Sequence, residues 1–170
     1  NVSLLTESRN DIIAIQLTEP YVGEEEVFAK TLCNALIQSI CTVMNLDDNE
    51  INGYYQPIAS QNGKLLIFET SEGGTGTLSS IVRDADLLKR IAVKALDILH
   101  FDEQGNDKDG ACATSCYNCI CNFFNQRDHK LFDRQCVKAI WTTIPEVVVT
   151  LPTSAKATLS NSGIDRVAFK

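Results

Sequence analysis

The stretch "CATSCYNCIC", residues 112–121, places four cysteines within ten positions. Cysteines this close together are poorly spaced to cross-link distant parts of a fold. We expect a cytoplasmic protein, because the sequence shows no secretion signal, and thiols there stay reduced. Tetrahedral zinc takes four soft or borderline ligands, with sulfur at about 2.3 Å. Cys112, Cys116 and Cys119 supply three such ligands, so the stretch predicts a structural Zn²⁺ site.

The fourth zinc ligand has two candidates. Cys121 is nearest in the sequence, although a Cys-x-Cys step in extended chain points its two side chains to opposite faces. His129 lies further along the chain and reaches the same ion if a turn intervenes. The sequence leaves the choice between Cys121 and His129 open. His100, at the expected end of a helix, is assigned no function.

Basic residues follow the cysteine stretch in a chain that is acidic overall. The chain has 170 residues and a formal net charge of −7. Such a charge argues against a nucleic-acid-binding surface that covers the whole domain, because phosphate binding depends on Lys and Arg clusters. Arg127, Lys130 and Arg134 form a local basic cluster in the sequence. They are the candidates for contact with DNA.

The composition is typical of a soluble globular domain, with 44% apolar and 22% charged residues. A chain of this length buries enough surface to form a core without disulfides. Cys33, Cys41 and Cys136 lie in apolar helical patterns, so we expect them to be buried in that core. No stretch approaches about 18 uninterrupted apolar residues, and we expect no membrane contact.

The hydrophobic pattern predicts an α+β fold, or a small α/β layer, in which a short mixed sheet accompanies two long helices and the cysteine knuckle. The expected elements are a strand at 11–18, a helix at 24–46, a hairpin of strands at 54–60 and 63–70, helices at 78–101 and 133–141, and a strand at 146–152. We expect residues 1–142 to form the zinc-binding domain. Residues 143–170 are expected to be a C-terminal extension, a strand followed by an irregular tail.

A glycine-rich turn, "SEGGTGT" at 71–77, separates an expected strand from an expected helix. Its glycines predict a sharp turn, with Thr75 or Thr77 capping the helix. The turn lacks the lysine of a G-x4-G-K-[ST] loop and does not fit G-x-G-x-x-G. Free N–H groups at the helix start would still be able to hold a phosphate of bound DNA.

Three motifs together resemble one known family. They are "LLIFETSEGGTGTLSSIV" (65–82), "CATSCYNCI" (112–120) and "NQRDHKLFDR" (125–134). They resemble the zinc-binding domain, formerly a domain of unknown function, near the C-terminus of MrfA-type superfamily 2 DNA helicases. The same domain occurs in helicase-associated proteins of phage-defence systems such as DISARM. The family reads Tyr-Asp-Thr, then Pro-Gly-Gly-Ala-Gly and a long helix, and later a Cys-Tyr-x-Cys-Leu knuckle followed by Asn-Gln, His and Leu-Asp-Arg.

The resemblance runs from about Thr6 to Trp141 and implies a zinc-stabilised accessory module. Its implied partner is a set of helicase motor domains in cis, or a helicase subunit in trans. The chain departs from many relatives, which carry a fourth Cys shortly after the third, where this chain has Asn125 or Gln126. The extra Cys121 is a second departure. The resemblance therefore also leaves the fourth ligand open.

The sequence favours a non-enzymatic domain of a DNA-processing or phage-defence protein, which positions nucleic acid or docks a motor or partner. The alternative is a metal-dependent hydrolytic or redox enzyme domain that uses the Cys/His cluster, with acid or base groups drawn from Glu69, Glu72, His129 and Asp133. Thiolate ligands disfavour this alternative, because catalytic zinc keeps an open coordination position. A third reading is an architectural module that binds no nucleic acid.

Overall fold

The computed structural model describes residues 9–17, 22–58 and 61–143 of the chain. Three strands form an antiparallel sheet in the order β1-β3-β2. They are β1 (Ile12–Gln16), β2 (Ile51–Ile58) and β3 (Gln61–Glu69). Alternate residues of β3, among them Leu65 and Ile67, are fully buried, as expected for a strand with one face on the core. Together with the helices, this sheet confirms the predicted α+β class. Both strand pairings in the described residues are antiparallel, so the predicted mixed sheet is wrong.

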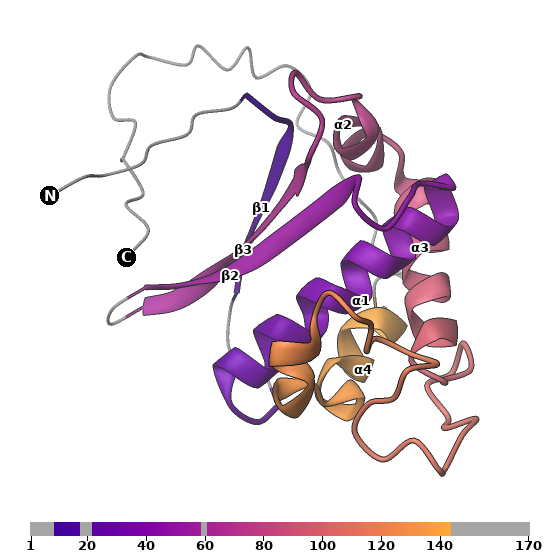
Figure 1. Cartoon of the computed structure of the whole chain (residues 1–170). Helices are drawn as coiled ribbons and strands as arrows, with labels where there is room; N and C mark the ends of the chain where they lie inside the picture. The colour runs from indigo at the N-terminus through magenta and orange to yellow at the C-terminus, as the bar shows by residue number, and fades with distance from the viewer. Residues whose placement is uncertain (1–8, 18–21, 59–60, 144–170) are drawn as a thin grey trace, which may run out of the picture.

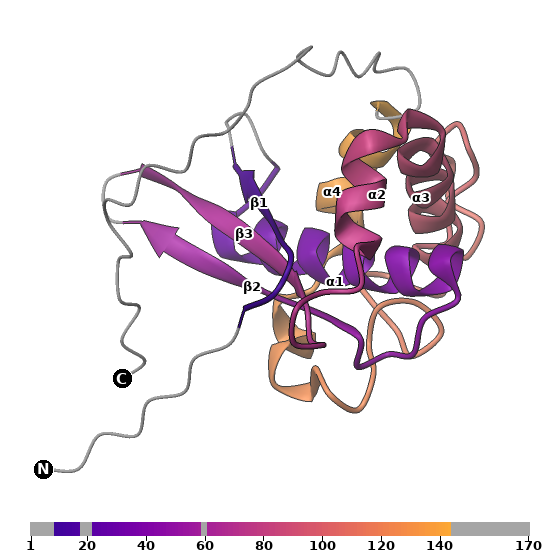
Figure 2. The same cartoon turned by 90° about the horizontal axis from the view of Figure 1, so that it is seen from above.

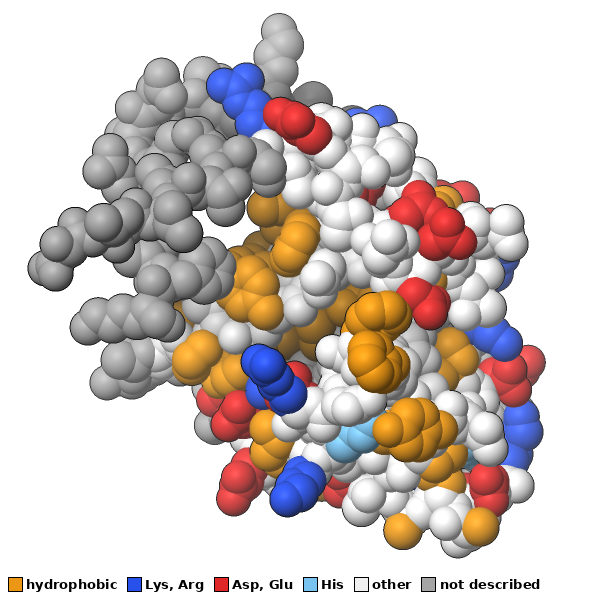
Figure 3. Space-filling model, in the orientation of Figure 1, with side chains coloured by type: hydrophobic (Ala, Val, Ile, Leu, Met, Phe, Trp, Pro, Cys, Tyr) orange, Lys and Arg blue, Asp and Glu red, His pale blue; other side chains and the backbone are white. Residues whose placement is uncertain are grey.

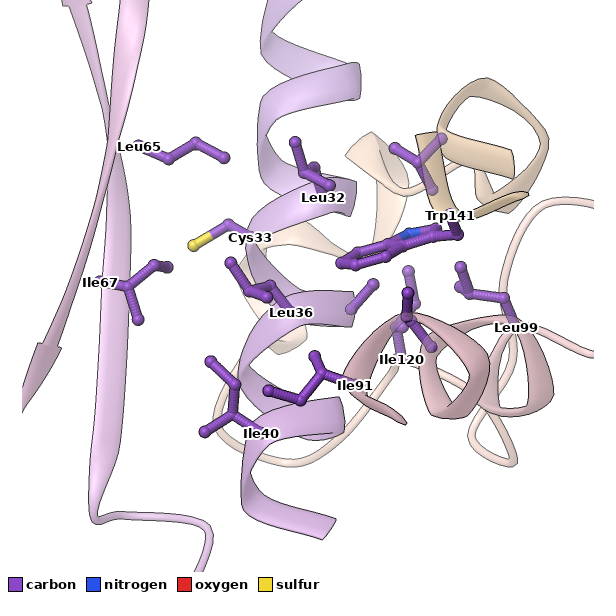
Figure 4. Close-up of a cluster of buried hydrophobic side chains, with 14 of the residues drawn as sticks. Leu32, Cys33, Leu36, Ile40, Leu65, Ile67, Ile91, Leu99, Ile120 and Trp141 are labelled. Carbon is purple, nitrogen blue, oxygen red and sulfur yellow. The ribbon is translucent and has the colours of Figure 1, made fainter. Parts of the chain in front are cut away.

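The helix α1 (Glu25–Met44) is the centre of the fold, with the sheet on one side and the remaining helices on the other (Figures 1 and 2). In Figure 4, Leu65 and Ile67 point toward α1 from the sheet, while Ile91 and Trp141 approach it from the opposite side. α1 begins with Glu25 and Glu26, which suit the positive end of the helix dipole. Burial on both sides explains why its sequence is apolar around most of its circumference.

Among the described residues, α1 is long and apolar enough to cross a membrane by length and composition alone. More than half of the apolar stretch of this helix is buried inside the fold. The core helix of a globular domain passes the same test of length and composition. The packing of α1 against the sheet and the other helices accounts for its apolar sequence.

The single helix predicted for 78–101 is wrong, because the structure has two helices there. α2 (Thr77–Arg83) ends just before Asp84, and α3 (Ala85–Ile98) begins just after it. Asp84 has an extended backbone (φ −117°, ψ 103°), and its carboxylate accepts hydrogen bonds from the N–H groups of Asp86 and Leu87. Aspartate is a preferred N-cap because it satisfies the free amides of the first turn. The apolar periodicity continues across this break and conceals it.

The chain after α3 forms a long loop, which contains the cysteine stretch, then the 3-10 helix η1 (Gln126–Leu131) and α4 (Arg134–Thr143). Cys33, Cys41 and Cys136 are buried in the core, as predicted, and all seven cysteines are free. Trp141 of α4 is also buried in the core. The strand predicted at 146–152, and nearly all of the predicted extension 143–170, lie outside the described residues.

The glycine turn between β3 and α2 is organised by a buried carboxylate. Glu69 is 1% exposed, and it accepts hydrogen bonds from the N–H of Leu78 at 2.8 Å, the hydroxyl of Thr75 at 2.7 Å, and the N–H of Thr75. Gly74 has φ +70°, and a Cβ there would lie 2.9 Å from Cγ of Asp11. The residue that caps α2 is therefore Glu69 rather than Thr75 or Thr77. Its carboxylate takes the amides that a phosphate would need.

Replacing Glu69 by Gln is expected to lower the free energy of unfolding by about 1.5–3 kcal/mol, the range for a hydrogen bond to a charged group. Burial alone would raise the pKa of Glu69, but the hydrogen bonds from Thr75 and Leu78 outweigh it and hold that pKa below its ordinary value. The contribution is therefore complete above the ordinary Glu pKa and is lost as the pH falls through the lowered one. Urea unfolding of the parent and of Glu69→Gln across this acid range measures the difference in the free energy of unfolding. The exposed Glu72→Gln is the matched control, and equal losses in the two variants would contradict the assignment.

Candidate metal centre

Four side chains converge in the part of the chain that the structure describes: His100, Cys112, Cys116 and Cys119. Their ligand atoms all lie within 4.8 Å of one another. The sulfur atoms of Cys112 and Cys119 are 3.9 Å apart, and Nε2 of His100 is 3.3 Å from the sulfur of Cys116. A tetrahedron with metal–sulfur bonds of about 2.3 Å has edges of about 3.8 Å. The cluster therefore has the size and the donor atoms of a Cys3His zinc site.

The backbone at the end of α3 brings His100 to this cluster. His100 has a positive φ of 62°, a left-handed conformation that is uncommon for residues other than glycine. Two hydrogen bonds close the end of the helix, from the N–H of Phe101 to the carbonyl of Leu96 and from the N–H of His100 to that of Asp97. The chain reverses at this point, and the imidazole faces the cysteine loop.

The knuckle between Cys116 and Cys119 is a tight turn. The carbonyl of Cys116 accepts hydrogen bonds from the N–H groups of Cys119 and Cys121, both at 3.1 Å. The N–H of Cys116 in turn donates to the sulfur of Cys119 at 2.9 Å. Such a bond stabilises a thiolate. Cys112 and Cys119 are buried, while Cys116 and His100 are partly buried, so most of the cluster is enclosed by protein.

The surroundings of the cluster shift the pKa values of its thiols in different directions. Burial, together with the neighbouring thiols Cys116 and Cys119, raises the pKa of Cys112 to about 12. Burial acts in the same direction on Cys116, but hydrogen bonds with His100 and Cys112 outweigh it and lower the pKa of Cys116 to about 7. Metal ligation requires the thiolate form. A zinc ion held at this point would supply the positive charge that lets all three thiols ionise.

The structure does not bring Cys121 or His129, the two candidates for the fourth position, to this cluster. The thiol of Cys121 is 3.3 Å from the hydroxyl of Ser115. Nε2 of His129 lies 2.8 Å from Oδ1 of Asn125 and 3.1 Å from the carbonyl of Asn122. The fourth place in the cluster belongs to His100, which the sequence reasoning passed over. Its signal was weak: a histidine at a helix end, followed by a polar loop that leads to the first cysteine.

The basic candidates separate into two kinds. Arg127 and Lys130 are both exposed, and both lie on η1. Arg134 is 1% exposed, and its guanidinium is 2.5 Å from the carboxylate of Asp107. A nucleic acid is unable to reach a side chain buried to this degree, so Arg134 does not belong to a nucleic-acid-binding surface. The prediction failed because proximity in sequence says nothing about which side of a helix faces the core.

The acidic residues considered for acid–base chemistry lie apart from the metal cluster. Glu69 caps α2, as described above, and Glu72 is exposed in the glycine turn. The carboxylate of Asp133 accepts a hydrogen bond from the N–H of Gln135 at the start of α4. The carboxylate that does lie near the cluster is that of Asp109, 4.0 Å from Nε2 of His100. Its place beside a ligand suits an outer position around the metal.

Fold and site together define a small α+β domain organised around a Cys3His metal cluster. The family model described as the MrfA Zn-binding domain (MZB) matches residues 32–120, just over half of the chain. The chain belongs to this family, and the matched region contains all four residues of the cluster. No curated protein and no solved structure matches the chain.

Zn²⁺ is the cofactor of this domain. The residues present fit it, because three cysteines and one histidine form a recognised ligand set for structural zinc. His100, Cys112, Cys116 and Cys119 would hold the ion. Four protein ligands complete the tetrahedral coordination that zinc prefers in structural sites, and the ion would tie the end of α3 to the knuckle.

Substitution of single ligands distinguishes this set from its alternatives. His100→Ala and Cys116→Ser are expected to lower the zinc content of the purified protein well below one ion per chain. Cys121→Ser and His129→Ala should keep the zinc content of the parent, because neither side chain lies in the cluster. Metal analysis of the purified proteins measures this. Full zinc in His100→Ala together with loss in either of the other two variants would contradict the assignment.

Proposed function

We propose that this domain is a structural zinc-binding accessory module of a DNA-processing or phage-defence protein, active in cis with a superfamily 2 helicase motor or beside one. In this proposal it contributes docking or positioning and carries no reaction of its own. Membership of the MrfA Zn-binding domain family supports the proposal. So does the resemblance of its motifs to those of helicase-associated proteins. A cytoplasmic location, where its free thiols stay reduced, belongs to the same proposal.

The composition of the metal cluster supports a structural role for the ion. Three thiolates and an imidazole fill the four positions of tetrahedral zinc, whereas catalytic zinc retains a position for water or substrate. Glu69 and Asp133 are engaged in backbone hydrogen bonds away from the cluster. Neither is placed to act as a general acid or base on a molecule bound to the metal.

Removal of zinc separates the structural role from a catalytic one. With a structural ion, a strong chelator is expected to abolish the cooperative thermal transition, or lower its midpoint sharply, because metal binding is coupled to folding. Differential scanning calorimetry with and without chelator measures this, and added zinc should restore the transition. A chelated domain that keeps the transition of the zinc-loaded protein would favour a catalytic or dispensable metal.

The observation that carries a docking role is a group of exposed aromatic side chains next to the knuckle. Tyr117, Phe123 and Phe124 are 69%, 75% and 82% exposed. Figure 3 shows hydrophobic side chains gathered on this face, close to a histidine and with Lys and Arg side chains nearby. Exposed aromatic groups rimmed by polar residues mark interaction sites in soluble proteins.

The turn that carries the two phenylalanines is well braced. The carboxamide of Asn122 accepts hydrogen bonds from the N–H groups of Phe124 and Asn125. Asn125 in turn donates to the carbonyl of Ile120 at 2.7 Å and to the carboxamide of Asn34 on α1 at 3.0 Å. A partner that binds this turn would have little loop entropy to remove, and a preorganised surface favours binding for that reason.

Two pairs of substitutions test what this face binds. Arg127→Ala with Lys130→Ala is expected to weaken binding to a DNA oligonucleotide and to reduce the slope of log affinity against log salt by about 2, roughly one per phosphate contact. Phe123→Ser with Phe124→Ser is expected to weaken association with the helicase motor. Fluorescence anisotropy and analytical ultracentrifugation measure the two effects.

The matched control for the basic pair is Lys89→Ala with Arg90→Ala, which removes the same charge from an exposed part of α3. If the two basic pairs lower DNA affinity equally, Arg127 and Lys130 act only through the overall charge of the domain and do not form a specific DNA contact. If neither the basic pair nor the phenylalanine pair changes any association, this face has no docking role.

A further inference from the structure

The buried side chain of Arg134 contacts the backbone that carries the zinc ligands. Arg134 begins α4, and its side chain extends into the loop between α3 and the knuckle. Its Nε donates to the carbonyl of Cys112 at 2.7 Å, and its Nη1 donates to the carbonyl of Leu99 at 3.0 Å. Its Nη2 binds Asp107 and also reaches the carbonyl of Asp109 at 3.2 Å. One guanidinium thus joins backbone atoms from both parts of the chain that supply ligands.

These contacts act close to the ligand atoms themselves. Cys112 is one of the four residues of the cluster, and Leu99 immediately precedes a second, His100. On the other side of that histidine, the N–H of Lys108 donates to the carbonyl of His100 at 2.7 Å. The backbone on both sides of a residue with a rare left-handed φ is therefore fixed by hydrogen bonds. Arg134 supplies the one at Leu99.

We propose that Arg134 is the positioning residue of the zinc site: its guanidinium holds the carbonyls of Leu99 and Cys112 so that the imidazole from α3 and the thiolates from the loop meet at one point. The proposal rests on the four residues of the cluster being the zinc ligands. Arginine suits this role because its planar group offers five fixed donors, while lysine offers a single rotating ammonium.

Charge favours the same arrangement. Three thiolates and Zn²⁺ carry a net charge of −1, and the guanidinium lies against the backbone of this anionic centre. Asp107 pairs with the guanidinium at its outer side, where the Asp107 side chain is 36% exposed. The guanidinium carbon also lies over the ring of Phe101, 4.8 Å from the ring centroid. The group is thus held from several directions, as expected of an outer-sphere residue that orients metal ligands.

The test is the zinc affinity of Arg134→Lys, measured by competition with a chromophoric chelator. The expected result is a dissociation constant 10- to 100-fold higher than that of the parent, the usual effect of removing an outer-sphere partner. The visible spectrum of the cobalt(II)-substituted variant should also change, because the bands report ligand geometry. Of these two readouts, a residue that only packs in the core would move the affinity alone, because metal binding is coupled to folding. A parent-like cobalt(II) spectrum in the folded variant would therefore overturn the proposal. The exposed Arg90→Lys on α3 is the matched control and should leave both unchanged.

A second variant covers the case in which Arg134→Lys does not fold. Asp107→Asn keeps the carbonyl contacts of the guanidinium but removes its charged partner, and it is expected to weaken zinc binding several-fold, with the exposed Asp86→Asn as control. Parent-like affinity and cobalt spectrum in a folded Arg134→Lys would overturn the proposal, as would parent-like affinity in Asp107→Asn if Arg134→Lys is unfolded. A parent protein that binds no zinc would overturn the site itself, a result distinct from either of these.

Discussion

The junction between the end of α3 and the cysteine loop depends on one set of bonds, those between a zinc ion and the side chains of His100, Cys112, Cys116 and Cys119. The loop from Asp102 to Ala111 is polar and mostly exposed, so it gains little from hydrophobic burial. The knuckle delivers Ile120, which is fully buried, into the core. η1 and α4 come next in the chain after this buried residue. If the loop were not tied down, the chain would have to order this segment against its conformational entropy with few apolar contacts in return.

The two halves of the fold meet on α1. One side of this helix packs on the sheet through residues such as Cys33, and its other side meets α3, α4 and the segment after the knuckle. Asn34 and Gln38 of α1 hydrogen-bond to Asn125 and to the carbonyl of Ile120, respectively. The metal-supported half is thus attached to the core helix by polar contacts as well as by apolar burial. This arrangement places an exposed aromatic turn on a support that hydrogen bonds fix to α1.

Much of the fold could be predicted from local patterns. The helix at 24–46, the two hairpin strands and the last helix appear within a few residues of their predicted bounds, because the periodicity of apolar residues is a local property. The break at Asp84 was missed, since a capping aspartate inside a continuous apolar pattern resembles an exposed helical residue. The role of Glu69 was missed for a different reason. A carboxylate that caps a helix from the preceding strand has no fixed sequence spacing.

The candidate site shows the same division between local and distant information. The three cysteines were identifiable because their spacing is itself a signature of metal binding. His100 was not, because its part depends on where α3 ends and on a left-handed residue at that end. Arg134 was grouped with Arg127 and Lys130 by sequence proximity, yet the first turn of α4 directs it inward. Charge in a sequence predicts a surface only when the burial of each residue is known.

The measurement that tests the central claim most directly is zinc K-edge X-ray absorption on the purified zinc-loaded protein. The account predicts one zinc environment with three sulfur neighbours at about 2.3 Å and one imidazole nitrogen at about 2.0–2.1 Å, with the imidazole signal lost in any zinc retained by His100→Ala. A shell of four sulfurs would place Cys121 in the site and contradict the ligand set described here. A shell rich in oxygen would contradict the closed structural site altogether.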